Sequence, residues 1–289
     1  MTSAGPSVVL VTGASGGIGS AVSLAYARSG ARLVLLARSP DDLDRLARRC
    51  LEAGAAGAVP VVADVADGGA VREAVRDVVA EHGRVDVTVH CAAVVAYGRF
   101  GDVPAEVWDR TVTVGVLGTA NVARAVLPTL AAQHGGGSLV VVGSLLGEVT
   151  VPFMSSYVTG KWAVRGLTRV LQQEARATPG VHVALVAPGS VDTAIYELAG
   201  SYAGRQGRPP PPVYGPERVA EAVLRVVAGR RRSAFVGVTN PLVRLGFVTV
   251  PRLYDVLVTP LMRMAGLGRD QVDPHAGNVL RPSQEVRTP

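Results

Sequence analysis

Cysteine and aromatic residues are scarce in this chain. Its 289 residues include two cysteines, Cys50 and Cys91, and only 4% of the residues are aromatic. Two thiols in a chain of this length exclude a disulfide framework, and they have no spacing typical of a metal site. Because aromatic side chains are few, valine, alanine and leucine must form the core, which favours buried parallel strands covered by helices.

Long runs of basic or apolar residues are also absent. The formal charge is +6, but no basic face is interleaved with aromatic residues, so we predict no nucleic-acid partner. The first residues lack a basic segment followed by an apolar core. No uninterrupted apolar run reaches the roughly 18 residues of a membrane-spanning helix. We therefore expect a cytoplasmic protein with no transmembrane span and no metal.

From residue 7 to residue 238 the chain alternates short apolar runs with amphipathic stretches. The apolar runs predict buried strands at residues 7–12, 32–37, 59–63, 85–91, 138–143, 181–187 and 233–238. This order predicts an α/β fold, a single-domain Rossmann-like, doubly wound parallel sheet of about seven strands with helices on both faces. Its ligand crevice should lie beyond the carboxyl ends of the strands.

The first predicted strand leads directly into a glycine-rich turn, which a predicted helix follows. The turn reads Thr12-Gly-Ala-Ser-Gly-Gly-Ile-Gly19. Glycines let the backbone approach a pyrophosphate, and the helix N-terminus offers free N–H groups to it. The alternative is an ordinary glycine-rich turn. We assign to a dinucleotide phosphate site Gly13, Ser15, Gly17, Ile18 and Gly19.

The second predicted strand ends at Ala37 and Arg38. In dinucleotide folds an acidic side chain here accepts from the ribose 2′-hydroxyl of NAD, whereas a nearby arginine pairs with the 2′-phosphate of NADP. No acidic residue stands at this position. We therefore predict that NADP(H) is preferred over NAD(H); the alternative is that Arg38 is a solvated charge at a strand end.

Another polar group follows the fifth predicted strand. Ser144 closes that strand, and Tyr157 and Lys161 lie four residues apart on one face of a predicted helix. A tyrosine can donate a proton to a carbonyl oxygen, and a neighbouring ammonium lowers its pKa from about 10 toward working pH. A serine hydroxyl can stabilise charge that develops on the same oxygen. The alternative is an unremarkable pair on a helix surface.

Taken together, these motifs resemble those of the short-chain dehydrogenase/reductases. The resemblance covers residues 7–238 and rests on Thr12-Gly13-x-x-x-Gly17-x-Gly19, Asp64, Ser144, Tyr157-x-x-x-Lys161 and Pro188-Gly189 through Thr193. It implies an oxidoreductase that transfers hydride between a nicotinamide and a secondary alcohol or ketone, with Tyr157 as general acid and base beside Ser144 and Lys161. It implies that Asp64 accepts from the adenine amine. The further cofactor-binding residues that it implies are Val65, Cys91, Ala92, Tyr157, Lys161, Pro188, Gly189, Val191 and Thr193.

Two positions depart from the family pattern. The fourth strand ends His90-Cys-Ala-Ala93 where the family usually has Asn-Asn-Ala-Gly, and we expect His90 to make a structural hydrogen bond rather than to act in catalysis. Gly115 stands where the family has an asparagine that holds a water on a proton relay from Lys161. Either the relay uses backbone and water alone, or turnover is impaired. The alternative function is therefore a nucleotide-binding protein with impaired catalysis and a binding or regulatory role. An extended-family epimerase or dehydratase is disfavoured by the glycine spacing.

The remaining segments are predicted from composition. Residues 194–216 are interpreted as a substrate lid, whose Tyr196, Tyr202 and Leu198 favour a small, moderately hydrophobic carbonyl or alcohol substrate. Residues 239–269 are predicted to form an apolar helical extension. For residues 240–267 we favour packing on the body or a partner subunit over a peripheral membrane contact. Residues 1–6 are expected to be a flexible N-terminus and residues 270–289 a loose tail. The family resemblance also implies a homo-oligomer.

Overall fold

The computed structural model describes residues 5–282, and its centre is a parallel sheet of seven strands. The strand order is β12-β7-β6-β4-β1-β2-β3, so the direction of winding reverses between β1 and β4. A doubly wound sheet binds ligands at such a reversal, beyond the carboxyl ends of its strands. The predicted seven-stranded Rossmann-like sheet is confirmed. Its strands are β1 (Val8–Thr12), β2 (Arg32–Ala37), β3 (Gly57–Val62), β4 (Val87–His90), β6 (Gly137–Val142), β7 (Val181–Pro188) and β12 (Ser233–Val236).

Helices cover both faces of the sheet because alternate strand residues point to opposite sides. Val9 and Val11 pack on one side, against α1 (Gly17–Ala27), α2 (Pro40–Glu52) and α7 (Pro216–Ala228). Val8 and Leu10 pack on the other side, against α3 (Gly68–His82), α5 (Gly118–Ala132) and α6 (Ser155–Glu174). All five residues of β1 are buried, which explains why the sequence of this strand is continuously apolar.

One continuous helix on the second face is unusually long. It comprises α4 (Ala105–Val112), the π-helical turn η1 (Thr113–Leu117) and α5. Within residues 5–282 it is the one helix long and apolar enough to cross a membrane by length and composition, a test that core helices also pass. Val122, Val126 and Leu130 of this helix are buried in the same core cluster as the strands. Packing against the sheet therefore accounts for its apolar face.

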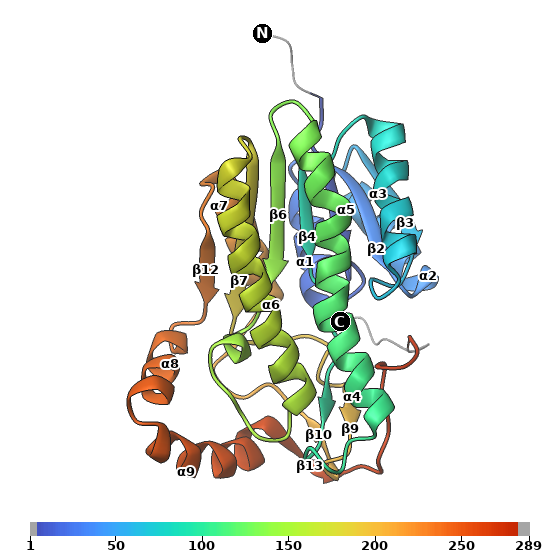
Figure 1. The fold of residues 1–289 in the computed structure, drawn as a ribbon. Helices are drawn as coiled ribbons and strands as arrows, with labels where there is room; N and C mark the ends of the chain where they lie inside the picture. The colour runs from blue at the N-terminus through green and yellow to red at the C-terminus, as the bar shows by residue number, and fades with distance from the viewer. Residues whose placement is uncertain (1–4, 283–289) are drawn as a thin grey trace.

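The predicted lid, residues 194–216, forms short strands rather than helices. β9 (Gly200–Ser201) pairs with β5 (Ala96–Tyr97), and β11 (Val213–Tyr214) pairs with β8 (Ser190–Val191). β10 (Arg205–Gly207) pairs with β13 (Leu267–Gln271). Figure 1 shows this region beyond the carboxyl ends of the main strands, beside α8 (Asn240–Thr249) and α9 (Pro251–Leu261). The remaining short elements are the 3-10 turns η2 (Leu145–Gly147) and η3 (Ala175–Ala177) and the π-helical turn η4 (Met262–Gly266).

The segment after residue 270 is docked onto the body, so the prediction of a loose tail is wrong for residues 270–282. His275 exchanges two backbone hydrogen bonds with Ser201, of 2.8 and 2.9 Å, and the Asn278 N–H donates to the Leu198 carbonyl at 2.9 Å. Val279 is fully buried in the core cluster. The remaining residues of the predicted tail, 283–289, and most of the predicted flexible N-terminus, residues 1–4, lie outside the described residues.

Candidate active site

The glycine-rich turn lies at the carboxyl end of β1 and touches the neighbouring strand end. Gly13 has a φ of +67°, and a Cβ added to it would lie 2.6 Å from the backbone of Ala92 after β4. A Cβ on Gly17 would lie 2.5 Å from the Thr193 side chain. The predicted glycine site and Thr193 therefore come together, and only glycine fits at these two positions.

This turn has the features of a cradle for an anionic group. Helix α1 begins at Gly17, and its N-cap residue Gly16 supplies no side-chain cap. The first N–H groups of the helix have no intrahelical partner, and they carry the positive end of the helix dipole. The observed turn therefore fits the pyrophosphate of a dinucleotide.

Ser144, Tyr157 and Lys161 meet beside this cradle. Ser144 follows the carboxyl end of β6, where its hydroxyl accepts from the Leu146 N–H at 3.1 Å. Tyr157 and Lys161 lie one turn apart on α6, with the Lys161 Nζ 5.5 Å from the centroid of the Tyr157 ring. The buried Lys161 ammonium donates to the Val142 carbonyl at 2.9 Å. The structure thus places all three predicted catalytic side chains in one group.

The pKa of Tyr157 is shifted opposite to the direction predicted from the sequence. Burial raises the pKa of Tyr157 well above 10, Tyr196 raises it further, and a hydrogen bond from Ser144 lowers it only in part. Burial also lowers the pKa of Lys161 to about 8. Removing both groups from water penalises their charged forms, and this is the largest cause of both shifts. Tyr157 is therefore a protonated phenol at neutral pH.

His90 and Cys91 are neutral at the end of β4. The His90 Nδ1 lies 2.7 Å from the Thr12 hydroxyl, so the ring makes the interstrand hydrogen bond expected for a structural role. Burial, assisted by the Lys161 charge, lowers the pKa of His90 to about 3. Burial raises the pKa of the Cys91 thiol to about 12. Neither group changes its charge near neutral pH, which argues against a role in proton transfer.

The segment after β7 lies at the same edge of the sheet as the glycine turn. β7 ends at Pro188, and β8, which contains Val191, is held by its pairing with β11. A Cβ on Gly189 would lie 2.8 Å from the Asn240 side chain, so this glycine allows α8 to approach. Thr193 then follows at the position facing Gly17. The structure brings this predicted cofactor segment next to the glycine turn.

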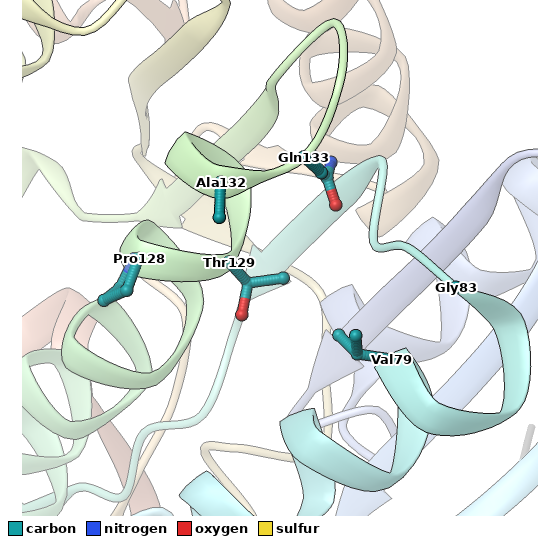
Figure 2. A pocket seen from close by; sticks show the side chains of 6 residues that line it. All are labelled: Val79, Gly83, Pro128, Thr129, Ala132 and Gln133. Atoms are coloured by element: carbon teal, nitrogen blue, oxygen red, sulfur yellow. The ribbon is translucent and has the colours of Figure 1, made fainter.

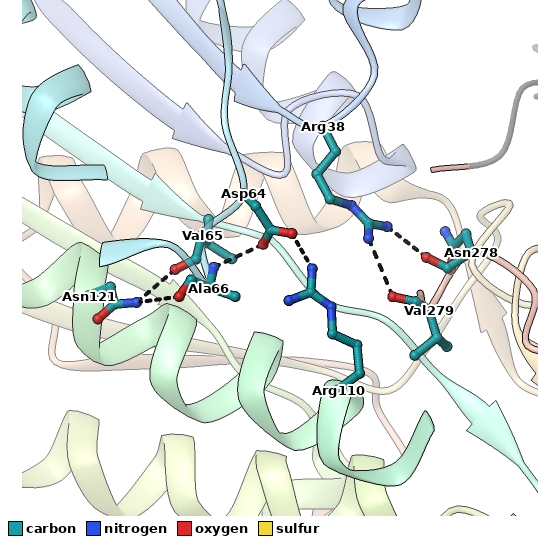
Figure 3. A network of polar contacts seen from close by, with 8 residues as sticks. All are labelled: Arg38, Asp64, Val65, Ala66, Arg110, Asn121, Asn278 and Val279. Carbon is teal, nitrogen blue, oxygen red and sulfur yellow. Dashed lines mark hydrogen bonds and ion pairs between the residues drawn. The ribbon is translucent and has the colours of Figure 1, made fainter. Parts of the chain in front are cut away.

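Arg38 and Asp64 follow β2 and β3, at the end of the site predicted to hold adenosine, and both have partners that the sequence analysis missed. Figure 3 shows Asp64 paired with Arg110 of α4, while the Arg38 guanidinium faces the C-terminal segment. Arg38 donates to the carbonyl of Asn278 at 2.7 Å and to the carbonyl of Val279 at 3.4 Å. Arg38 is therefore not the solvated charge of the alternative interpretation. A 2′-phosphate bound at this position would have to share the Arg38 guanidinium with these two carbonyls or displace them from it.

The turn after β3 is held by its own hydrogen bonds. The Asp64 carboxylate accepts from the Ala66 N–H at 2.9 Å. The Asn121 amide of α5 donates to the carbonyls of Val65 and Ala66 at 3.0 and 3.3 Å (Figure 3). Val65 is buried, and a Cβ on Gly118 would lie 2.7 Å from its side chain. The predicted adenine-side residues therefore sit on a rigid turn.

Gly115 lies in the π-helical turn η1, close to α6. A Cβ added to Gly115 would have the Gly160 Cα as its nearest neighbour, at 3.9 Å, so a larger residue has room. The Gly115 carbonyl accepts a hydrogen bond from the Thr119 hydroxyl at 2.6 Å. The backbone oxygen that a water relay would use is therefore already engaged by one donor.

A surface hollow lies away from these groups. Figure 2 shows this hollow of about 450 Å³ between the ends of α3 and α5. It is lined by Val79, Gly83, Pro128, Thr129, Ala132 and Gln133. None of these side chains is a proton donor suited to the chemistry above, so we place the candidate site at the carboxyl edge of the sheet. Within residues 5–282, no three His, Cys, Asp or Glu side chains are grouped as metal ligands.

Comparisons with known proteins agree with the family resemblance of the motifs. The family model for short chain dehydrogenases matches residues 7–202. The probable oxidoreductase EphD of Mycobacterium tuberculosis is 34% identical over 244 residues, which cover 78% of this chain and 40% of that protein. The chain thus spans less than half the length of this relative.

Two solved structures differ in the nucleotide that they hold. An alcohol dehydrogenase from the archaeon Thermococcus sibiricus, complexed with 5-hydroxy-NADP, has a TM-score of 0.69 at 30% identity, covering 80% of this chain and 95% of that one. A short chain dehydrogenase from Mycobacterium paratuberculosis, bound to NAD, has a TM-score of 0.70 at 26% identity, covering 80% of this chain and 96% of that one. These structures leave both nucleotides open for this chain.

Proposed function

This chain belongs to the short-chain dehydrogenase/reductase family, and from that premise we propose that it is an NADP(H)-dependent oxidoreductase that interconverts a secondary alcohol and a ketone. The observation that carries this proposal is the grouping of Ser144, Tyr157 and Lys161 beside the glycine cradle. The Lys161 Nζ lies 5.5 Å from the Tyr157 ring centroid, and Ser144 is near enough to lower the pKa of Tyr157 through a side-chain hydrogen bond. A proton donor and a second hydroxyl thus face the end of the crevice where a nicotinamide would lie.

The residues at the cradle fit a dinucleotide. Gly13 and Gly17 leave space that a Cβ would fill, and the uncapped start of α1 suits a pyrophosphate. Gly13, Ser15, Gly17, Ile18 and Gly19 would hold the phosphates. Ala92, Lys161 and Thr193 would contact the nicotinamide half. When bound, the cofactor would supply or accept the hydride.

Tyr157 would give its proton to the carbonyl oxygen during reduction. Its raised pKa keeps the phenol protonated, which suits a general acid. Ser144 would donate a hydrogen bond to the same oxygen as negative charge develops there. Because burial lowers the pKa of Lys161 to about 8, its ammonium is retained below that pH and lost above it. At neutral pH the positive charge beside Tyr157 would then stabilise the phenolate that remains after the proton is given up.

The surroundings of Tyr157 support a small, moderately hydrophobic substrate. Tyr157 packs against an apolar cluster to which Met154 and Val158 of the α6 region, Tyr196 of the lid and Met262 of η4 contribute. An apolar wall with a few polar groups is typical of a small-molecule site. The substrate carbonyl would lie at Ser144 and Tyr157, with its carbon substituents against this cluster.

The charge at the adenosine end supports NADP(H) over NAD(H). Arg38 and Arg110 bring two guanidinium groups to this end, and Asp64 is the carboxylate paired with Arg110. Because Arg110 is paired with Asp64, the Arg38 charge is not balanced by a carboxylate within residues 5–282. This charge suits a 2′-phosphate better than a 2′-hydroxyl. Arg38 would bind that phosphate once its hydrogen bonds to the carbonyls of Asn278 and Val279 are shared or exchanged.

A second candidate, a nucleotide-binding protein with impaired catalysis, is favoured by Gly115. This position has no side chain to hold a relay water, and its carbonyl already accepts from Thr119. Tight NADPH binding without turnover of any carbonyl compound would select this candidate.

Exchange of a single hydroxyl tests the proposed function. Tyr157→Phe removes the proton donor and should lower ketone reduction by about 10²–10⁴-fold, while NADPH still binds. Tyr26→Phe is a matched control, because the Tyr26 hydroxyl is buried and has no hydrogen-bond partner among the described residues. NADPH oxidation over a panel of ketones and nucleotide binding by fluorescence give the readouts. Unchanged reduction by Tyr157→Phe would exclude Tyr157 as the acid.

A further inference from the structure

The two C-terminal helices expose an unusual number of large apolar side chains. On α9 and η4 these recur at the spacing of one helical face: Leu253, Val256, Leu257, Leu261 and Met264. On α8 and the link that follows they are Leu242, Leu245, Val248 and Val250. Their exposed fractions range from 47% to 70%. A contiguous apolar surface of this kind marks a contact with a protein or a membrane.

The inner side of the same helices is fixed to the body. Arg244 of α8 pairs with the buried carboxylate of Glu148 at 3.0 Å. The Tyr254 hydroxyl of α9 donates to the Thr150 carbonyl at 2.8 Å, and the Tyr254 ring packs edge-on against Phe247. The outward apolar face is therefore held in place, and its exposure is not explained by a detached helix.

Positive charge accompanies this apolar face. Residues 240–266 contain three arginines, Arg244, Arg252 and Arg263, against one acidic residue, Asp255. Arg244 is paired with Glu148 on the inner side, so Arg252 and Arg263 are the arginines left to accompany the face. Arg252 is exposed and has no ion-pair partner among the described residues, and Arg263 lies over the Phe153 ring rather than against a carboxylate. Exposed apolar residues with neighbouring arginines are typical of a helix that lies in the headgroup region of a bilayer.

We propose that α8, α9 and η4 form a surface that binds an anionic lipid bilayer. A second copy of the chain fits this face less well, because a two-fold contact through the same patch would bring its arginines close to those of the other copy. Anionic headgroups would instead neutralise this charge while the apolar residues enter the interface. Figure 1 shows the helix pair away from the sheet, at the end to which its strands point.

Membrane contact would place the substrate side of the site near the bilayer. Val258 and Met262, on the inner side of α9 and η4, pack in the same apolar cluster as Tyr157. If the proposed function is correct, a lipid-dissolved alcohol or ketone would have a short route to Tyr157. This consequence rests on the proposed function, whereas bilayer binding does not require catalysis.

Vesicle binding by the full chain tests the proposal. The wild type is mixed with vesicles of phosphatidylcholine and phosphatidylglycerol, or of phosphatidylcholine alone, and separated by flotation. A triple variant carries Leu253→Gln, Val256→Gln and Leu257→Gln at positions that are 55%, 69% and 48% exposed. A control triple variant carries Leu51→Gln, Val62→Gln and Val170→Gln at positions that are 51%, 59% and 48% exposed. Thermal melts establish that each variant is folded.

We expect the wild type and the control to bind the anionic vesicles more tightly than the neutral ones. The α9 triple variant should lose about tenfold or more of its partition coefficient. No vesicle binding by the wild type, or equal binding by the α9 variant, would overturn the proposal. Light scattering tests whether a second copy of the chain occupies this face instead. A wild-type dimer that the α9 substitutions convert to a monomer would assign the face to a second copy and would also overturn the bilayer proposal.

Discussion

The two ends of the predicted nucleotide site are built in different ways. At the nicotinamide end, Ser144, Tyr157 and Lys161 come from one loop and the helix that follows it, and Lys161 is bonded to the Val142 carbonyl of the adjoining strand. At the adenosine end, Arg38 donates hydrogen bonds to the carbonyls of Asn278 and Val279, which lie 240 and 241 residues away in the chain. The first end depends on local spacing and the second on the docking of a distant segment. Substitutions should therefore separate catalysis from nucleotide selection.

The largest expected effect is at the nicotinamide end. Ser144→Ala removes the hydroxyl that would stabilise the developing oxyanion, so kcat for ketone reduction should fall by about 10²–10³-fold. The Kd for NADPH should change little. Ser138→Ala, near the start of β6, the strand that precedes Ser144, is the control. A large loss of NADPH affinity in Ser144→Ala would show that the two ends are not separable.

A smaller effect on binding is expected at the adenosine end. Arg38→Ala removes a guanidinium that would face the 2′-phosphate, and should weaken NADPH binding by about 10–100-fold. NADH binding should be nearly unchanged, because NADH has no such phosphate. Arg32→Ala, at the start of the same strand, serves as the control. Equal losses of affinity for both nucleotides, measured by calorimetry, would contradict the assignment of Arg38 to the 2′-phosphate.

The docked C-terminal segment should contribute measurably to stability. Val279→Ala removes two methyl groups from a fully buried site, which should lower the free energy of unfolding by about 2 kcal/mol. Leu280→Ala changes the next residue, which is exposed, and should cost less than about 0.5 kcal/mol. Denaturant unfolding compares the two. Identical midpoints would mean that the segment is not docked in solution.

The smallest expected effect is at Gly115. Gly115→Asn restores a side chain for the relay water at a position with room for it, and should raise kcat by a few-fold, on the order of 2 to 10. Gly166→Asn is the control, since Gly166 is also helical and has open space around it. Steady-state assays at saturating NADPH make the comparison. A gain shared by both variants would reflect helix propensity and not the relay.

The sequence predicted the sheet and the nicotinamide end because both depend on short-range periodicity. Continuous apolar runs marked strands buried on both faces, and a four-residue spacing placed Tyr157 and Lys161 on one face of a helix. The pKa of Tyr157 was predicted in the wrong direction, because its sign depends on burial among residues from several elements. Spacing identifies neighbours but does not measure desolvation.

The adenosine end could be predicted only in part. The absence of an acidic residue after β2 pointed to Arg38, but nothing in the local pattern indicated the pairing of Asp64 with Arg110, 46 residues away. The segment at residues 274–280 contains proline, glycine and asparagine, a composition that normally predicts a loop. Its docking depends on the buried Val279, on backbone hydrogen bonds that any sequence could make, and on the hydrogen bonds that Arg38 donates to its carbonyls.

The hydrogen bond between Arg38 and the Asn278 carbonyl also bears on the order of events during synthesis of the chain. A ribosome that adds about 5–20 residues per second reaches Asn278 roughly 10–50 seconds after Arg38. The remaining strands of the sheet, the last of which is β12 at Ser233–Val236, are all made within that interval, while the adenosine end still lacks its covering segment. A nucleotide present during synthesis would meet Arg38 before Asn278 and Val279 do. The order in which the two partners reach this arginine is therefore set by translation.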